Sequence, residues 1–372
     1  MPDGENLMIS RQRVQKSLAL GVLLIASWAA ASPADPRDTN SPYGMLEFLP
    51  WDQEWSHFHY TEERVEKAAA LMEEAGVRIV RIDFAWEDIE PRQGEFSFAK
   101  HERILDALDR HHLKTLAILH YNPAWRSSAP WNSAPIQEDY LTYARATIHH
   151  FKTRVKYWEI WNEPDSKTYW IPQDGMVAYS RLLKAVYPVI KAEDPSAQVL
   201  LGGMTENGPF SLRRVYQNAG KDCFDIVNIH PFADPIRPHS NQTLKGIYIS
   251  LMRVMKEFGD EDKPIWFTEL GCPGVKKPGT NNGWWEGMSP TEEQQAQWVT
   301  TVYTEALQWK GVKKIFWAFF RETPDIFHCG VDNFGLVRDD FSKKLAYEAY
   351  KRAAHPHMAA SQHLNQTASA HN

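Results

Sequence analysis

The chain has 372 residues, 43% hydrophobic and 24% charged, so it can bury a large core as two ordinary domains or as one α/β barrel. Its formal net charge of -6 leaves no basic footprint for nucleic acid, and no nucleic-acid partner is expected. Aromatic residues make up 12% of the chain and include 15 tryptophans. Tryptophan can stack on the apolar faces of ligands, but it is also mostly buried in large cores. Only tryptophans at strand ends and in loops therefore count toward a binding site.

The N-terminus is typical of an export signal. Three basic residues precede the apolar stretch 18–31, which is too short to cross a bilayer comfortably and ends in three alanines that suit cleavage. We predict a signal peptide over residues 1–31 and a secreted or periplasmic protein with no membrane attachment after cleavage. An uncleaved anchor is the alternative.

Eight apolar, strand-like runs follow, with helical patterns between them. The runs are 43–49, 77–86, 114–121, 155–163, 198–204, 224–232, 264–270 and 313–320. The helical patterns lie near 61–75, 99–111, 137–152, 174–192, 211–219, 243–258 and 343–353, with one more starting after Ser289. Thr61 is a predicted N-cap and Gly76 a predicted helix stop, and Ser289-Pro290-Thr291-Glu292 is typical of a capping box.

This alternation predicts parallel βαβ units. Closing them into a (β/α)8 TIM barrel uses residues 36–355 as a single α/β domain. A doubly wound open sheet is the alternative, but it normally has a glycine-rich phosphate loop after a strand, and we find none. The tail 356–372 is rich in Ala, His, Ser and Gln, and we predict that it is disordered.

The three cysteines, Cys223, Cys272 and Cys329, are too few to build the fold, and none has C-x-x-C spacing. Cys272 follows the seventh strand and Cys329 the eighth, at the same end of the barrel, whereas Cys223 begins the sixth strand at the other end. In an exported chain we therefore predict a Cys272–Cys329 disulfide, with three free thiols as the alternative. The histidine pairs at 111–112 and 149–150 lie near predicted helix ends, where they suit the helix dipole, so we predict no metal site.

Polar and aromatic residues gather at the C-terminal ends of the predicted strands, where the active sites of such barrels lie. In chain order they are Arg81, then His120, Tyr121 and Trp125, then Asn162 and Glu163, then His230, Glu269 and Trp317. The two glutamates stand out because an unneeded buried carboxylate is costly. Two facing carboxylates suit glycoside hydrolysis, in which one protonates the leaving oxygen and the other attacks the sugar or activates water.

The sequence "WNEP" ending the fourth strand, with a glutamate ending the seventh, resembles the large clan of (β/α)8 retaining glycoside hydrolases. The segments "RIDFAWEDIEPRQGEFSF", "YWEIWNEPD" and "FGLV" are most similar to family 39 and its endo-acting relatives, which cleave bacterial exopolysaccharides. The resemblance covers nearly the whole chain after the signal segment. It implies cleavage of O-glycosidic bonds in a poly- or oligosaccharide with net retention, through a glycosyl-enzyme intermediate and without a cofactor.

The resemblance also implies a role for each position. Glu163 would be the acid/base, Glu269 the nucleophile and Asn162 the ligand of the sugar 2-hydroxyl. Arg81 would hold Glu269, and His230 would flank it. His120, with Tyr121 and Trp125 beside it, would bind sugar hydroxyls. Trp317 would form the floor of the subsite.

Several alternatives remain open at this stage. Arg81 could instead neutralise Glu159, which has the same strand parity as Glu163, and Trp317 could be core packing. The loop residues Trp51, Trp55, Trp284 and Trp285 could line a groove for several sugar units or pack a lid over the barrel. The chain ends soon after its eighth helix, without the β-sandwich of family 39 β-xylosidases, which favours the endo-acting type over an exo-acting, xylosidase-like enzyme. A barrel that binds glycans without cleaving them is the other alternative.

Overall fold

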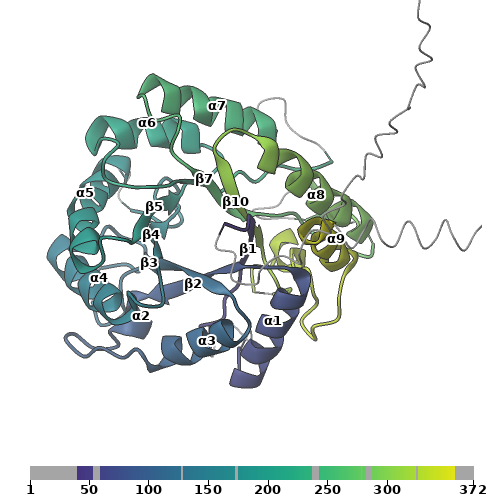
Figure 1. Cartoon of the computed structure of the whole chain (residues 1–372), viewed down its shortest axis with the longest axis horizontal. Coiled ribbons are helices and arrows are strands. Elements are labelled where there is room, and N and C mark those ends of the chain that lie inside the picture. Colours follow the sequence, from purple (N-terminus) through teal and green to yellow (C-terminus); the bar gives the residue numbers. More distant parts are fainter. Residues whose placement is uncertain are drawn as a thin grey trace, which may run out of the picture. The chain divides into compact units, whose positions relative to one another are not determined.

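The computed structural model describes residues 40–52, 59–126, 129–171, 175–236, 243–277, 279–281, 287–323 and 326–356. These residues belong to the unit Asp35–Asn372, in which the strands lie at the centre and the helices around them (Figure 1). The predicted signal peptide and the predicted tail beyond Pro356 lie outside the described residues. No helix of the described residues is both long and apolar enough to cross a membrane.

Within the described residues, eight parallel strands form one sheet. They are β1 (Tyr43–Leu46), β2 (Ile79–Ala85), β3 (Lys114–His120), β4 (Tyr157–Asn162), β5 (Gln198–Gly203), β6 (Val227–Ile229), β7 (Ile265–Leu270) and β10 (Val312–Ala318). Their order is β5-β4-β3-β2-β1-β10-β7-β6. Bridges from Leu200 to Ile226 and from Met204 to Ile229 join β5 to β6 and close the ring. The predicted (β/α)8 barrel is confirmed.

Helices follow the strands around the outside. They are α1 (Glu62–Ala75), α2 (Trp86–Ile89), α3 (Ala99–Arg110), α4 (Gln137–Phe151), α5 (Gly175–Glu193), α6 (Gly208–Asn218), α7 (Leu244–Glu257), α8 (Glu292–Glu305) and α9 (Leu345–Ala354), with 3-10 turns η2 (Ala306–Gln308) and η3 (Gly330–Asn333). A two-stranded antiparallel pair, β8 (Thr280–Asn281) and β9 (Gly287–Met288), lies between β7 and α8. The short α2 was not predicted.

Local signals set the helix ends. Thr61 caps α1 as predicted, with its side chain accepting from the Arg64 amide, and Gly76 ends the helix with a φ of 90°. The predicted start of α8 is wrong by two residues, because its N-cap is Thr291 and the capping box pairs Thr291 with Gln294. Thr291 itself forms a parallel bridge to Val275, whose amide donates to the Pro290 carbonyl at 3.0 Å.

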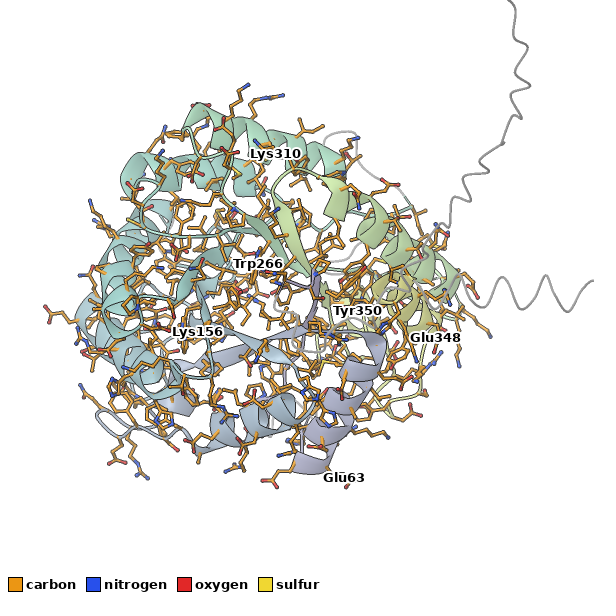
Figure 2. All side chains as sticks on the ribbon, viewed as in Figure 1. Glu63, Lys156, Trp266, Lys310, Glu348 and Tyr350 are labelled. Carbon is orange, nitrogen blue, oxygen red and sulfur yellow. The ribbon has the colours of Figure 1, made fainter. Side chains whose placement is uncertain are left out.

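Two hydrophobic clusters hold the barrel together. The larger one packs the helices against the outside of the sheet. The smaller one fills the inside of the ring with side chains from around the sheet, namely Ile79, Leu116, Leu200, Ile226, Trp266 and Phe316. Figure 2 shows Trp266 near the centre of the ring, whereas Glu63 and Glu348 lie on its outer side. The packed interior leaves the strand ends as the place for polar chemistry.

Candidate active site

Arg81, on β2, joins the charged residues of the site. Its side chain is 2% exposed and forms two hydrogen bonds with Glu159 on β4, from Nε to Oε2 at 2.7 Å and from Nη2 to Oε1 at 2.8 Å. Nη1 donates to Oε1 of Glu269 on β7 at 2.7 Å, and Nη2 also donates to Oδ1 of Asn162 at 3.0 Å. Arg81 therefore makes both of the contacts that the sequence left as alternatives: it neutralises Glu159 and it holds Glu269.

The end of β4 departs from regular strand geometry. Consecutive side chains of a strand point to opposite faces, yet Asn162 contacts Arg81 and the next residue, Glu163, also faces the site. Trp161 and Glu163 have φ values of 68° and 41°, a region that is uncommon for residues other than glycine. Such backbone strain costs of order 1–3 kcal/mol and persists only where the surroundings enforce it. Here the Glu163 amide donates to the Gly203 carbonyl at 3.0 Å.

Strand β7 has an irregularity of its own. Its pairing with β10 shifts register between Phe267 and Leu270, so that β7 has one extra residue there. Bulges of this kind redirect side chains and are common beside active sites. As a result two neighbours both face inward. Thr268 contacts His230, and Glu269 reaches the open end of the barrel with 15% of its side chain exposed.

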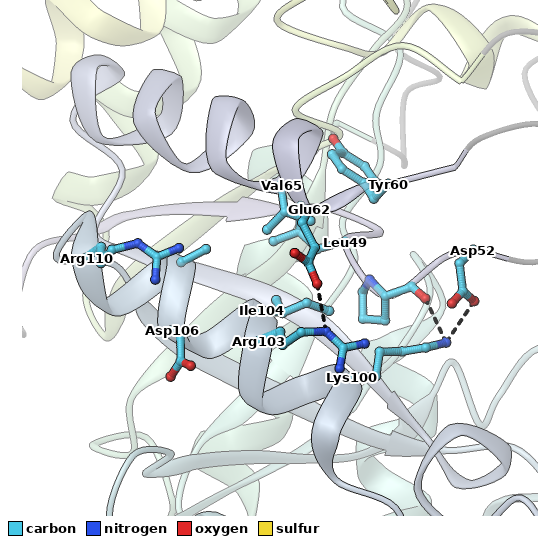
Figure 3. Close-up of a pocket in the computed structure, with 12 residues that line it drawn as sticks. Leu49, Asp52, Tyr60, Glu62, Val65, Lys100, Arg103, Ile104, Asp106 and Arg110 are labelled. Atoms are coloured by element: carbon cyan, nitrogen blue, oxygen red, sulfur yellow. Dashed lines mark hydrogen bonds and ion pairs between the residues drawn. The ribbon is translucent and has the colours of Figure 1, made fainter.

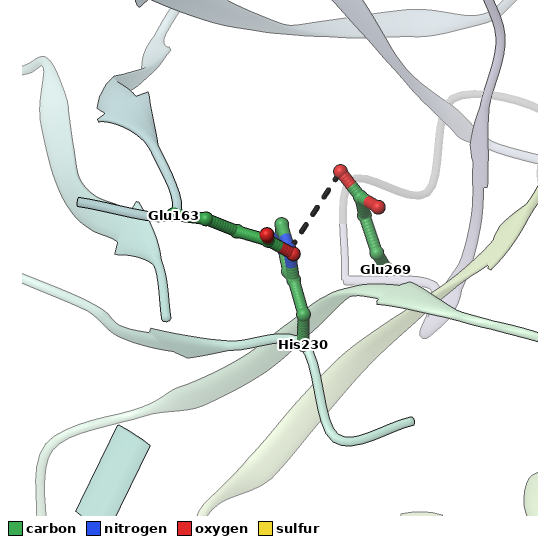
Figure 4. A group of neighbouring side chains, drawn as sticks. All are labelled: Glu163, His230 and Glu269. Carbon is green, nitrogen blue, oxygen red and sulfur yellow. Dashed lines mark hydrogen bonds and ion pairs between the residues drawn. The ribbon is translucent and has the colours of Figure 1, made fainter. Parts of the chain in front are cut away.

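Glu163, His230 and Glu269 converge from the ends of β4, β6 and β7 (Figure 4). His230 Nδ1 lies 2.9 Å from Glu163 Oε1 and 3.7 Å from Glu269 Oε1. One oxygen of each carboxylate and one ring nitrogen all lie within 4.8 Å of one another. Two carboxylates and an imidazole at this spacing could also serve as ligands of a metal ion. The sequence prediction for this position is an acid/base pair without a metal.

The pKa values of the two glutamates are raised to different extents. Burial raises the pKa of Glu163 well above its usual value, and the charges of Glu269 and Asp165 raise it further. Burial also raises the pKa of Glu269, to about 7, but Arg81 opposes this rise because a nearby positive charge favours the ionised form. Glu163 is therefore the carboxyl group that keeps its proton, and Glu269 ionises first.

The ends of β2 and β3 supply a polar wall. His120 is 4% exposed, and neither ring nitrogen has a hydrogen-bond partner among the described residues. The Asp83 carboxylate lies beside the ring, with Oδ1 at 3.4 Å from Nε2. Asp83 is held by the indole N–H of Trp51 at 2.7 Å. Tyr121 stacks on His120 with ring centroids 3.9 Å apart. Because burial lowers the pKa of His120 well below its usual value, its neutral ring is left with a donor and an acceptor for a bound hydroxyl.

Two aromatic residues of this site were missed by the sequence analysis. Trp131, on the loop after β3, is 49% exposed and meets the Tyr121 ring edge-on at 4.8 Å. Tyr169, on the loop after β4, lies 6.4 Å from Tyr121 and 6.3 Å from Trp131 between ring centroids. Burial and then the charges of Glu163 and Glu269 raise the pKa of Tyr169. The only signal in the sequence was their position soon after two strand ends.

Two predicted binding residues have partners of their own in the structure. Trp125 donates its indole N–H to the Glu90 carbonyl at 2.7 Å and meets the Trp86 ring edge-on, and no contact among the described residues joins it to the carboxylates. Trp317 is fully buried and donates to the Phe334 carbonyl at 2.9 Å. A ring without exposed surface cannot form the floor of a sugar site. The structure thus corrects the predicted role of Trp317 to core packing.

A second group of aromatic rings lies at the ends of β1 and β10. Trp51 stacks on Phe48 at 4.1 Å, and Phe48 in turn lies 4.8 Å from Phe319. Phe319 also stacks with Phe327 at 5.8 Å. The other tryptophans predicted to line a groove or a lid, Trp55, Trp284 and Trp285, lie outside the described residues.

All three cysteines belong to the described part of the chain and are free thiols, so the predicted Cys272–Cys329 disulfide is not formed. Cys272 is fully buried in the core. Cys329 is the N-cap of the turn η3, where its sulfur accepts from the backbone of Asp332 and the Asp332 carboxylate accepts from the Cys329 amide. This local capping holds the sulfur against its own turn. The predicted alternative of three free thiols is the one observed.

A separate pocket lies between α1 and α3 (Figure 3). Lys100 spans part of it and forms ion pairs with Asp52 and Asp88, both at 2.8 Å. None of the predicted site residues lines this pocket, whose walls are Leu49, Pro50, Asp52, Tyr60, Glu62, Val65, Lys100, Arg103, Ile104, Asp106, Ala107 and Arg110. It is therefore distinct from the site at the strand ends.

Sequence comparison matches part of the chain. A family described as Glyco_hydro_42, beta-galactosidase, matches residues 54–120. A 6-phospho-beta-galactosidase of Lacticaseibacillus casei is 26% identical over 114 residues, which are 28% of this chain and 23% of that protein. Beta-glucosidase 25 of Oryza sativa subsp. japonica is 27% identical over 134 residues, 34% of this chain and 26% of that protein. The chain thus spans about a quarter of the length of these curated relatives.

Solved structures match nearly all of the fold. A family 39 glycoside hydrolase from Bacteroides cellulosilyticus WH2 has a TM-score of 0.69 at 22% identity, over 86% of this chain and 64% of that chain. A monomeric beta-xylosidase from Caulobacter crescentus CB15 has a TM-score of 0.63 at 18% identity, over 83% of this chain and 67% of that chain. Xylanase 10B from Thermotoga maritima has a TM-score of 0.60 at 16% identity, over 86% of this chain and 96% of that chain. The predicted resemblance is therefore confirmed: this chain is similar in fold to the (β/α)8 glycoside hydrolases, with family 39 among its structural neighbours.

Proposed function

We propose that this protein is a retaining glycoside hydrolase that cleaves O-glycosidic bonds in a poly- or oligosaccharide. The observation that carries the proposal is the pair Glu163 and Glu269 at the open end of the barrel, with carboxylate oxygens within 4.8 Å of each other. Retaining enzymes place their carboxyl groups about 5 to 5.5 Å apart, whereas inverting enzymes need about 6.5 to 9.5 Å to admit a water. The glycosidase names among the chain's relatives and structural neighbours support the same class.

The first step follows from the difference between the two carboxyl groups. Glu163, whose pKa is the more strongly raised, protonates the oxygen of the leaving sugar. Glu269, held by Arg81, attacks the anomeric carbon and forms a glycosyl-enzyme ester as the bond to the leaving oxygen breaks. Asn162 gives its Oδ1 to Arg81, and its Nδ2 forms no hydrogen bond among the described residues, so this amide is available for the 2-hydroxyl of the sugar.

The second step releases the sugar. Glu163, now ionised, takes a proton from a water molecule, which attacks the anomeric carbon and breaks the ester to Glu269. Two displacements at the same carbon give net retention. His120 would bind sugar hydroxyls during both steps, because neither of its buried ring nitrogens forms a hydrogen bond among the described residues.

The aromatic surface beside the pair favours a substrate longer than one sugar unit. Trp131 is 49% exposed and lies against Tyr121 and Tyr169, and Tyr121 stacks on His120 of the site. A half-exposed indole next to polar side chains can stack on a pyranose ring beyond the point of cleavage. We therefore place a sugar unit of the polymer on Trp131. To test this, the native protein and Trp131→Ala are both screened on polysaccharides and on aryl glycosides. The variant should lose affinity for the polymer and not for an aryl monoglycoside.

The mechanism is tested by replacing each carboxylate. Glu163→Ala should lose turnover of natural substrate by about 10²–10⁴-fold, yet still react with substrates whose leaving group needs no acid. Glu269→Ala should lose both activities, and azide should restore turnover with inverted product. The stereochemistry of the native product is read by NMR. Inverted product from the native enzyme would contradict retention, and binding of glycans with no cleavage of any substrate would favour the non-catalytic barrel.

We also propose that the protein is exported after cleavage behind Ala31. The basic residues and the short apolar stretch of the N-terminus support this proposal. The mass and N-terminal sequence of the protein isolated from its natural host test it. A chain that starts at Ser32 in the periplasm or medium is the expected result, and a full-length chain in the membrane fraction would favour the uncleaved anchor.

A further inference from the structure

A chain of hydrogen bonds runs through the barrel behind Glu163. His230 Nδ1 lies 2.9 Å from Glu163 Oε1, and His230 Nε2 lies 3.0 Å from the Thr268 hydroxyl. The Thr268 hydroxyl donates to Asn228 Oδ1 at 2.8 Å, and Asn228 Nδ2 donates to the Leu201 carbonyl at 3.0 Å. His230, Thr268 and Asn228 have no exposed surface, so water does not replace these bonds.

The direction of each hydrogen bond in this chain follows from the bond between Asn228 and the Leu201 carbonyl. The Leu201 carbonyl can only accept, so Asn228 must present its NH₂ group to Leu201 and its oxygen to Thr268. An amide oxygen also only accepts, which commits the single Thr268 proton to Asn228. The Thr268 oxygen is then an acceptor toward the ring, and His230 must carry a proton on Nε2.

The same argument fixes the protonation of the other ring nitrogen, His230 Nδ1. A neutral imidazole that carries its proton on Nε2 has a lone pair on Nδ1. Burial and the charge of Arg81 lower the pKa of His230 well below its usual value, so the ring is neutral. A lone pair 2.9 Å from Glu163 Oε1 forms a hydrogen bond only if the Glu163 carboxyl group holds the proton.

We propose that Thr268 and Asn228 are positioning residues that fix His230 as the Nε2–H tautomer, so that Nδ1 accepts from Glu163 and favours the protonated acid. The tautomer stands independently of any activity; only the benefit to the acid step rests on the proposed function.

The packing around His230 supports this assignment. A Cβ on Gly203 would lie 1.8 Å from His230 Nε2, so the backbone of β5 covers this edge of the ring and leaves Thr268 as its partner. Other charges also act on Glu163, and they do so from most sides of the barrel. Asp165, Glu206 and Glu269 disfavour its ionised form and Arg81 favours it, while Tyr121 and Tyr169 face it from the loops after β3 and β4.

The tautomer can be read directly by NMR of protein labelled with ¹⁵N-histidine. His230 signals are identified by their loss in His230→Gln. At neutral pH we expect a protonated Nε2 and an unprotonated Nδ1 in the native protein. The opposite tautomer, or a doubly protonated ring, would overturn the proposal whether or not the protein is a glycosidase. A glycosidase screen without any activity would leave the tautomer result standing.

Variants of Thr268 test what the tautomer does. Thr268→Val keeps the shape but removes the acceptor, so a proton on Nε2 would be buried without a partner and the ring should shift to the Nδ1–H form. That form donates to ionised Glu163. The basic limb of kcat/KM for a poor leaving group should then move to lower pH by about one unit. Thr268→Ser should restore the native tautomer and the native limb. If Thr268→Val is less stable but keeps the native tautomer and the native basic limb, Thr268 has a structural role only.

Discussion

At the scale of single residues, the site depends on how Arg81 is shared between two carboxylates. Arg81 donates two hydrogen bonds to Glu159, which is fully buried, and one to Glu269. Glu159 also accepts from the Gly203 amide at 3.0 Å, which fixes its position. Its charge raises the pKa of Glu269, while Arg81 lowers it. The buried pair thus adjusts the pKa of Glu269, the proposed nucleophile.

Glu159→Gln should shift the acidic limb of the pH profile. The limb reports ionisation of Glu269, whose pKa lies at about 7. Removing the negative charge of Glu159 lowers that pKa, so the variant should keep activity to lower pH than the native enzyme. The pH dependence of kcat/KM on an activated substrate measures the limb. Glu90→Gln, a buried glutamate that bonds Trp86 and Gly94 away from the site, is the matched control. A limb that moves to higher pH in Glu159→Gln would contradict this account.

At the scale of elements, the strand ends are irregular where the candidate site lies. The positive φ values at the end of β4 and the bulge in β7 each bring two consecutive side chains toward the site. Strand β5 contributes space instead of side chains. Its final residue, Gly203, lies against the His230 ring, and a Cβ at Gly202 would meet the Ile160 carbonyl at 2.6 Å. The two glycines let the end of β4 and the His230 ring lie close against β5.

Gly203→Ala should displace His230. The added Cβ would lie 1.8 Å from Nε2, a contact that must be relieved by moving the ring or the backbone. Overpacking of this kind typically costs about 1–3 kcal/mol, and loss of the contact with Glu163 should lower kcat by at least about tenfold. Thermal unfolding and kcat measure the two effects. Gly279→Ala is the control, because nothing lies within 4 Å of its added Cβ. Equal kcat values in the two variants would rule out the tight contact at Gly203.

At the scale of the whole molecule, the first and the last strand of the ring, β1 and β10, pair side by side, and a buried carboxylate ties their ends together. Glu47, just after β1, has no exposed surface and accepts from the backbone amides of Phe48 at 3.0 Å and Arg321 at 2.8 Å. Arg321 follows β10, and its guanidinium lies 4.4 Å from the centre of the Tyr60 ring. Burial raises the pKa of Glu47 to about 7, opposed by Arg321.

This raised pKa links stability to pH. Since the folded pKa of Glu47 lies above its unfolded value of about 4.5, its contribution is fully present below pH 4.5 and is lost as pH rises through about 7. The loss is on the order of 3 kcal/mol. Glu47→Gln cannot ionise, so its Tm should fall less, or rise more, than that of the native protein between pH 5 and pH 8. Calorimetry at both pH values measures the difference, with the exposed Glu63→Gln as control. Identical slopes in Glu47→Gln and the native protein would contradict the link.

The eight strands and the helices between them could be predicted because hydrophobic periodicity and capping are local properties of the chain. For the same reason Glu163 and Glu269 stood out, since each ends a predicted strand at the end of the barrel where active sites lie. Only the closed barrel decided which distant residues meet. Arg81 reaches Glu159 and Glu269 across 78 and 188 positions, and such distances have no signal in one sequence.

Tertiary packing also decided the details that the sequence pattern got wrong or could not address. Trp317 ends a strand like the site residues, yet its ring is enclosed by the core. Cys329 is held by its own turn and not by Cys272. The bulge in β7 and the strained end of β4 break the two-residue alternation on which strand predictions rest. Composition and periodicity therefore determined the barrel and the end that holds the candidate site. The orientation of each side chain there followed from steric fit and hydrogen bonds between strands that are far apart in the chain.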